Sequence, residues 1–283
     1  MKTDLIYGVE DRPPFKDAIF AALQHLLAIF VAIITPPLII AGALKLDVEK
    51  TSFLVSMSLF VSGISTFIQC KRFGPVGARL LCIQGTSFSF IGPIITTGLM
   101  GGLPLIFGVC MAAAPVEMVI SRTFRYMRNI ITPLVSGIVV LLIGLSLIKV
   151  GVVSCGGGYG AMDNGTFGSW ENLSIAGLVL LSVLFFNRSK NKYLRMSSIV
   201  LGICLGYGLA FALGKVDMSS LNLNLLTSFN IPMPFKYGLD FNISSFIAIG
   251  LVYLITAIEA TGDVTANSMI SGLDIEGEGY VKR

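Results

Sequence analysis

The stretch LLCIQGTSFSFIGPIITT, residues 80–97, combines an apolar composition with the marks of a broken helix. Gly85 is followed by aromatic side chains at alternate positions, Phe88 and Phe90, and then by the pair Gly92-Pro93. This pattern favours a short extended stretch over a continuous helix. At membrane depth such backbone is tolerated where protein or a water-lined cavity satisfies its polar groups. Discontinuous segments of this kind form substrate sites in transporters, although a kink filled by neighbouring helices would give the same pattern.

The remainder of the chain is also rich in apolar residues. Of the 283 residues, 54% are hydrophobic and 13% are charged, and the mean hydropathy is +0.83. Soluble domains carry about 25% charged residues, and their surface helices keep one polar face, whereas the long segments here are apolar all round. A helix that crosses a bilayer core needs about 20 apolar residues. We therefore expect an all-α polytopic membrane protein with about eight crossings and a discontinuous third helix.

The predicted crossings alternate with short loops that contain most of the Lys and Arg residues. The crossings are predicted at Ala18–Ile40, Phe53–Ile68, Leu80–Leu99, Leu103–Ile120, Pro133–Val150, Leu173–Phe186, Ser197–Leu213 and Ile243–Ile258. Basic residues mark the cytoplasmic side of such helices. With the N-terminus inside, 15 of the 20 Lys and Arg face the cytoplasm, and the other five are Lys45, Lys50, Lys149, Lys215 and Lys236. We therefore predict that both termini are cytoplasmic and that residues 151–171 form an outer loop.

Several classes of protein are disfavoured by the sequence. The first 16 residues are mixed in charge and lack the apolar core of a cleavable signal peptide. The five cysteines are odd in number and form no CxxC pair, so neither a disulfide framework nor a zinc site is expected. Without a P-loop, a HExxH motif or a nucleophile elbow, we expect no enzyme, no metal and no organic cofactor. The net charge of +4 resides in loops assigned to the cytoplasm, so no nucleic-acid partner is expected.

Two acidic residues near the last predicted crossing are candidates for function. Glu259 and Asp263 lie in LITAIEATGDVTA, residues 254–266, and a helix places carboxylates four positions apart on one face. Ionisable groups within a membrane are costly and are functional candidates by default. Repulsion and desolvation suit one of the pair to take up a proton, while an ionised carboxylate accepts hydrogen bonds from ligand N–H groups. Two acids at a cytoplasmic helix end would show the same spacing, and the pattern leaves that interpretation open.

Two other ionisable residues lie within predicted crossings. His25 is the one histidine of the chain, and a lone histidine in an apolar helix is more often a hydrogen-bonded packing element than a ligand. It cannot build a zinc site by itself. Glu117 lies near the cytoplasmic end of its crossing and close to Arg122, so pairing or snorkelling accounts for it.

Nine stretches spread over nearly the whole chain form a specific combination. They are YGVEDRPPF (7–15), QHLLAIFVAIITPPLII (24–40), SMSLFVSGI (56–64), GPVG (74–77), IQGTSFSF (83–90), RNIITPLVSGIVVLLIGLSLIKVG (128–151), GGGYGAM (156–162), GTFG (165–168) and EATGDVTA (259–266). In these stretches the sequence resembles the nucleobase–cation symporters, the xanthine/uracil permease family, and within that family the bacterial xanthine permeases.

This resemblance implies a proton-coupled purine importer of the inner membrane. The implied fold has two inverted repeats of seven helices, divided into core and gate domains, and works as a homodimer with the proton as coupling ion. Residues 1–17 would be a cytoplasmic N-terminal segment, 18–213 the first repeat, and 214–283 the start of the second repeat with a cytoplasmic tail. Family members have about fourteen crossings, so the resemblance also implies a carrier truncated after the eighth.

The resemblance implies a role for each of three ionisable residues, Glu259, Asp263 and His25. The acid at Glu259 would bind the nucleobase N–H groups from helix eight. The acid at Asp263 would be needed for activity, in proton coupling, and the histidine at His25 would support the site geometry from helix one.

The resemblance also assigns roles within the interrupted segment. Gln84, Ser87 and Phe88 would lie by the purine, with Phe88 offering backbone groups and a ring contact. Residue 87 would influence which purine is accepted. Ser87 departs from the asparagine of some strict xanthine carriers, so selectivity for xanthine against urate stays open.

The expected function is purine:proton symport, of xanthine or urate, by a protein embedded in the lipid bilayer or by its N-terminal portion. A carrier for uracil or another anion on the same fold is a near alternative. A membrane fragment that does not transport, and that assembles with or inhibits an intact relative, is an alternative of a different class.

Overall fold

Helices form most of the chain that the structure describes. The computed structural model describes residues 7–8, 11–71, 73–74, 76–127, 133–191, 194–195, 197–216, 233 and 235–271. Predictions that concern the basic residues at positions 2, 72, 128, 192, 282 and 283, or the tail from 272 onward, lie outside the described residues.

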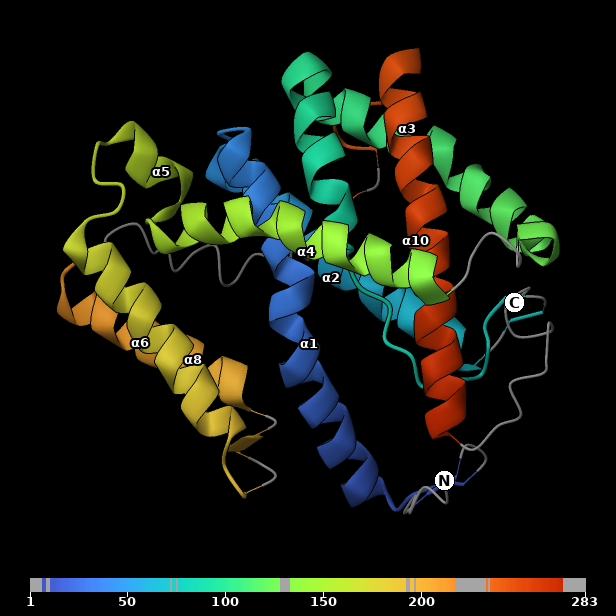
Figure 1. The fold of residues 1–283 in the computed structure, drawn as a ribbon, viewed down its shortest axis with the longest axis horizontal. Coiled ribbons are helices and arrows are strands. Elements are labelled where there is room, and N and C mark those ends of the chain that lie inside the picture. Colours follow the sequence, from blue (N-terminus) through green and yellow to red (C-terminus); the bar gives the residue numbers. More distant parts are fainter. Residues whose placement is uncertain are drawn as a thin grey trace. The chain divides into compact units, whose positions relative to one another are not determined.

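The helices follow the predicted crossings (Figure 1). They are α1 (Phe15–Ala43), α2 (Val48–Lys71), the 3₁₀ turn η1 (Phe88–Phe90), α3 (Ile91–Met127), α4 (Pro133–Cys155), α5 (Gly158–Asp163), α6 (Trp170–Asn187), α8 (Ser198–Ala212) and α10 (Ile243–Ile270). In the described part of the chain, strand-type pairing is limited to an isolated bridge between Phe73 and Val76. The all-α expectation is therefore confirmed, and the short α5 is an element that the sequence did not predict.

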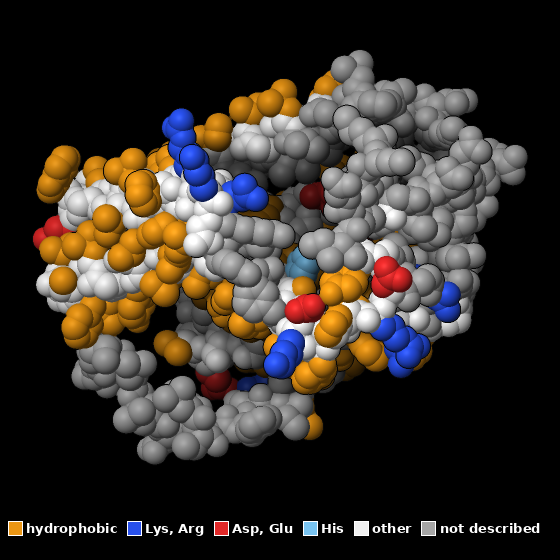
Figure 2. Space-filling model, turned by 90° about the horizontal axis from the view of Figure 1, so that it is seen from below, with side chains coloured by type: hydrophobic (Ala, Val, Ile, Leu, Met, Phe, Trp, Pro, Cys, Tyr) orange, Lys and Arg blue, Asp and Glu red, His pale blue; other side chains and the backbone are white. Residues whose placement is uncertain are grey.

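Several helices have the length and the surface of membrane spans. Among the described residues, five are long and apolar enough to cross a bilayer, in α1, α2, η1 with α3, α6 and α10, and α8 is a shorter apolar helix. Hydrophobic side chains cover much of the described surface in Figure 2, with few charged ones between them. Exposed apolar side chains at this density suit contact with lipid, and the prediction of a polytopic membrane protein is confirmed.

α3 consists of two helices joined at a break. Gly101 (φ −151°, ψ 17°) and Gly102 (φ 66°, ψ −159°) both leave the helical region. The positive φ of Gly102 is one that glycine adopts without steric cost. The two halves, residues 91–100 and 103–127, run in different directions (Figure 1). The predicted division between the third and fourth crossings is thereby confirmed.

The described residues form two compact units. The first draws on the described residues of the segments 1–13, 36–147 and 234–283 and contains α2, η1, α3 and α10. The second draws on residues 14–35 and 148–233 and contains α5, α6 and α8. α1 and α4 each contribute residues to both units, and the boundary within α1 falls at Pro36.

The core of the first unit lies between α3 and α10. Leu105, Val109 and Ala113 of α3 and Ile249 of α10 are buried against one another. The residues that lead into α10 also approach α3 closely, because the Asp240 N–H donates to the Pro104 carbonyl at 2.9 Å. At this contact a Cβ on Gly108 would overlap the Asp240 backbone, so the second half of α3 requires a glycine there.

The second unit is organised by α6 and α8. Gly202 and Gly206 of α8 are buried, and a Cβ on either would overlap Val183 or Val179 of α6. Small residues four apart allow two membrane helices to approach closely. Before α6, the Asn172 amide donates to the carbonyls of Gly156 (2.9 Å) and Thr166 (3.0 Å) and so closes the loop that contains α5.

Candidate functional site

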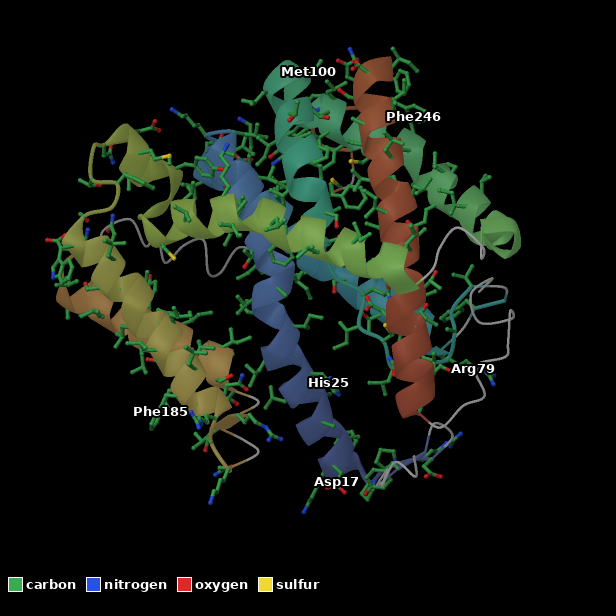
Figure 3. The ribbon with its side chains drawn as sticks, viewed as in Figure 1. Asp17, His25, Arg79, Met100, Phe185 and Phe246 are labelled. Atoms are coloured by element: carbon green, nitrogen blue, oxygen red, sulfur yellow. The ribbon has the colours of Figure 1, made fainter. Side chains whose placement is uncertain are left out.

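The interrupted segment and the first half of α3 run antiparallel to α10. Contacts along the pair join Leu81 to Asn267 (3.0 Å), Ser87 to Glu259 (3.4 Å), Phe90 to Tyr253 (4.9 Å between ring centroids) and Met100 to Ser245 (3.9 Å). In Figure 3, Met100 and Phe246 lie at one end of this pair and Arg79 lies near the other. Two stretches far apart in sequence thus form one continuous face.

The backbone between Arg79 and Ser87 is not helical, which confirms the predicted interruption. Ser87 is extended (φ −92°, ψ 133°) and caps η1, because its Oγ accepts a hydrogen bond from the Ser89 N–H at 3.3 Å. Residues 91–100 rise about 15 Å as a helix, which is half of a bilayer core of about 30 Å. A chain that crosses the membrane here needs the extended stretch to cover the other half.

Glu259 of α10 faces the start of η1. Its Oε2 lies 3.4 Å from Ser87 Oγ and 3.5 Å from Ser89 Oγ, and both hydroxyls can donate to it. The first turn of a helix leaves backbone N–H groups without intrahelical acceptors and carries a partial positive charge. A strong acceptor and a group of donors therefore lie side by side, and a planar ligand with N–H and C=O groups on one edge fits such an arrangement.

An aromatic pair anchors this turn to α10. The Phe90 ring packs edge-on against Tyr253, with an interplanar angle of 69°. The Tyr253 hydroxyl in turn donates to the Cys110 carbonyl in the second half of α3 at 3.3 Å. α10 is thereby tied to both halves of α3, and the position of Glu259 relative to η1 is fixed on either side of the break.

The extended stretch is held by polar side chains from two helices. From α2, the Ser62 hydroxyl donates to the Gln84 carbonyl, and Thr66 Oγ1 accepts from the Gln84 N–H at 2.9 Å. From α10, Asn267 Nδ2 donates to the Leu81 carbonyl at 3.0 Å. These partners satisfy backbone groups that would be costly to leave unpaired in hydrocarbon.

The structure brings together some of the predicted site residues. Glu259, Ser87 and the half-buried Phe88 meet at η1. The Gln84 side chain turns back on its own segment, because its amide donates to the Cys82 carbonyl at 3.4 Å. Asp263 is exposed and lies one turn beyond Glu259. α10 continues to Ile270, so neither acid lies at the end of the helix.

The other two ionisable candidates are His25 and Glu117. His25 is exposed on α1, within the second compact unit, and its predicted support of the site stays a prediction. Figure 3 labels its position on that helix. Glu117 of α3 is half buried, and the side chain of its predicted partner Arg122 lies outside the described residues.

Four polar residues of this site were missed in the sequence. Ser89 is the second hydroxyl at Glu259, and Ser62, Thr66 and Asn267 hold the extended stretch. A signal for Ser89 was present, because TSFSF places a second hydroxyl residue two positions after Ser87. The other three look like ordinary small polar residues of membrane helices, and only their contacts distinguish them.

Comparison with known proteins decides the family. A family model described as a permease family matches residues 16–283, nearly the whole chain. The chain belongs to the xanthine/uracil permease family. The resemblance noted in the sequence is thereby confirmed, and the family is one of transporters rather than enzymes.

Relatives within the permease family include carriers of purines by name. Xanthine permease XanP of Escherichia coli strain K12 is 47% identical over 292 residues, which cover 99% of this chain and 62% of the relative. Xanthine permease XanQ of the same strain is 46% identical over 294 residues, with 99% and 62% covered. Uric acid permease PucJ of Bacillus subtilis strain 168 is 33% identical over 264 residues, with 92% and 58% covered. The chain thus spans less than two thirds of the length of these relatives.

Proposed function

We propose that this chain supplies the nucleobase-binding part of a purine:proton symporter of the bacterial cytoplasmic membrane, with xanthine as the first substrate to test. The observation that carries the proposal is the Glu259 carboxylate beside the start of η1, between Ser87 and Ser89. The high identity to two xanthine permeases of E. coli supports the choice of substrate.

Binding uses the complementary edges of the ligand and the site. The ionised Glu259 carboxylate accepts hydrogen bonds from adjacent N–H groups of the purine, and such charge-assisted bonds are the strong ones. The amide at Phe88, in the first turn of η1, donates to a purine carbonyl oxygen, where the helix dipole favours negative charge. The Phe88 ring offers an apolar face to the base, and the Gln84 amide turns from its own segment toward the ligand.

Proton coupling falls to Asp263. This carboxyl lies one turn from Glu259 on the same helix and is exposed, so it can exchange a proton without displacing the substrate. A protonated Asp263 removes one negative charge from the membrane interior while the carrier changes its orientation, and this lowers the cost of the step. His25 supports the site geometry from α1.

The wider arrangement belongs to the same proposal. Residues 18–213 form the first of two inverted repeats, residues 214–283 begin the second, and both termini are cytoplasmic. The complete carrier is a homodimer.

Urate is a second candidate substrate, because Ser87 is small and a uric acid permease is among the relatives. A hydroxymethyl side chain leaves room for the additional oxygen of urate beside the ring of the base.

The test is uptake of radiolabelled xanthine by the full-length gene product in a host without purine permeases. We expect saturable accumulation that an uncoupler abolishes, and competition by unlabelled xanthine and urate. Accumulation of uracil in place of xanthine, or no uptake above the empty-vector host at equal expression, would overturn the proposal.

A further inference from the structure

Two hydroxyl side chains of α2 engage Gln84 as a neighbouring β-strand would. Ser62 and Thr66 are four residues apart and so share one face of α2. The Ser62 hydroxyl donates to the Gln84 carbonyl, and the Gln84 N–H donates to Thr66 Oγ1 at 2.9 Å. The donor and the acceptor of one residue are both paired from the same side, which is the pattern of a hydrogen-bonded position in a β-ladder.

This use of hydroxyls differs from that at a nearby position of the same helix. Ser58, one turn before Ser62, donates to the Leu54 carbonyl of its own helix at 2.9 Å, as serine in a helix commonly does. Ser62 is 8% exposed and directs its hydrogen bond out of the helix. The two serines can therefore be compared directly, since they are the same residue type and differ only in the carbonyl to which each hydroxyl donates.

Gln84 is well placed to control the site. It precedes Ser87 by three residues in the non-helical stretch, and Ser87, which is itself extended, both caps η1 and reaches Glu259. An extended chain advances about 3.3 Å per residue and reverses its faces with each step. A slip of one residue at Gln84 would therefore move Ser87 and Phe88 away from Glu259 or turn them to the opposite side.

We infer that Ser62 and Thr66 are positioning residues of the substrate site. Through the backbone of Gln84 they fix the register of residues 82–87 against α10, and this register sets how well the site distinguishes one purine from another. The inference rests on the proposed function of the same site. The inference adds two residues of α2 to the site, and these residues act on the ligand indirectly, through the Gln84 backbone.

Hydrogen–deuterium exchange tests the hold without any substrate. The variants are Ser62→Ala, which removes a donor, and Thr66→Val, which removes an acceptor at nearly constant shape; Ser58→Ala is the matched control. In the purified protein, peptides that cover residues 80–87 are expected to exchange faster in both variants and at the original rate in Ser58→Ala. Thr66→Ser keeps the acceptor and is expected to restore slow exchange.

Transport kinetics test the consequence for the ligand. We expect Ser62→Ala and Thr66→Val to raise the KM for xanthine about fivefold, the factor that corresponds to one ordinary hydrogen bond, with a smaller change in kcat. The ratio of inhibition constants for xanthine and urate should move toward one. Ser58→Ala and Thr66→Ser should keep the original KM and the original ratio.

The possible outcomes separate this inference from the proposed function. Unchanged hydrogen–deuterium exchange of residues 80–87 in both variants would show that Ser62 and Thr66 do not hold this segment in place. Faster exchange with an unchanged inhibition ratio would overturn its role in discrimination. If the unaltered protein takes up no purine, the proposed function fails, while the exchange result still decides whether α2 holds the segment. Should Ser62→Ala fail to fold, the pair Thr66→Val and Thr66→Ser decides the question alone.

Discussion

Two serines that alternate with aromatic residues lie beside the Glu259 carboxylate. Ser87 and Ser89 bring their hydroxyls to one carboxylate oxygen, at 3.4 and 3.5 Å, while Phe90 between the site and the core packs on Tyr253. Two weak donors can be exchanged for ligand N–H groups at little cost. A carboxylate tied into a short ion pair could not be released in this way, so the site is suited to reversible binding.

The first prediction concerns the two carboxylates. Glu259→Gln turns one acceptor oxygen into a donor, and since hydrogen bonds to charged groups contribute about 1.5–3 kcal/mol, we expect purine affinity to fall on the order of 10- to 100-fold. Equilibrium binding of labelled xanthine to the purified protein measures this. Asp263→Asn should retain binding and exchange but lose uncoupler-sensitive accumulation. Wild-type affinity in Glu259→Gln would remove this acid from the site.

The second prediction concerns selectivity. In Ser87→Asn the larger amide should take the space that the additional oxygen of urate needs, so inhibition of xanthine uptake by urate should weaken several-fold. Asparagine is as good a helix cap as serine, so η1 should still begin at the same residue. Competition assays with both purines measure the effect. Equal inhibition by urate before and after the substitution would show that residue 87 does not read the ligand.

The break in α3 gives α10 two separate partners. η1 and the first half of α3 present Phe90 and Met100 to it, and the second half of α3 presents the buried core around Val109. Because the halves meet α10 on both sides of the Gly101–Gly102 break, a displacement of α10 would change the site and the core together.

A third prediction follows from the close approach at Gly108. Gly108→Ala would force a methyl group into the Asp240 backbone, and overpacking of this kind costs about 1–3 kcal/mol. We expect a lower apparent melting temperature in fluorescence-detected size-exclusion chromatography. Gly250→Ala on α10 is the control, because a Cβ there meets nothing within 4 Å. Equal melting temperatures for the two variants would mean that the lead-in to α10 does not press on α3.

Sequence reasoning identified the helices and the broken segment more readily than the contacts that support them. The length of apolar runs and the Gly/Pro pattern are local signals, so residues 80–97 and the division at Gly101–Gly102 were predicted. The hydrogen bonds from α2 to Gln84 and from α10 to Leu81 depend on which helices are neighbours in the fold. A single sequence does not contain that information. The helical spacing of Glu259 and Asp263 was correct, but the continuation of α10 to Ile270 was not predicted, because the polar residues after Ile258 resemble a helix end.

Several lysines in the loops pair with acids in the part of the chain that the structure describes. Lys236, in the lead-in to α10, pairs with Glu49 at the start of α2 at 2.7 Å, and this hydrogen bond raises the pKa of Lys236 above its ordinary value. Lys215 pairs with Glu171 at 2.9 Å. These lysines are among the five that the charge bias assigns to the outside. Under that predicted orientation, their pairing with acids offsets the positive charge on the outer side.

The fourth prediction concerns orientation in the membrane. Cys155 is exposed at the end of α4, on the loop predicted to face outward. As the one cysteine left, with Cys70, Cys82, Cys110 and Cys204 replaced, it should react with an impermeant maleimide in intact cells. Lys190→Cys in a cysteine-free background, on a loop predicted to be cytoplasmic, should react after permeabilisation alone. The reverse pattern would invert the topology.

The antiparallel pairing of residues 81–100 with α10 has a consequence for biosynthesis. Leu81 leaves the ribosome 186 residues before its partner Asn267, a delay of about 10–40 s at 5–20 residues per second. Ser62 and Thr66 precede Gln84 by 22 and 18 residues, so α2 is already complete when the extended stretch is made. During this interval the hydroxyls of α2 are available in the nascent chain to form hydrogen bonds with Gln84. We expect α10 to dock onto a segment that its neighbour has already shaped, so that loss of both hydroxyls would expose the newly made protein to membrane quality-control proteases.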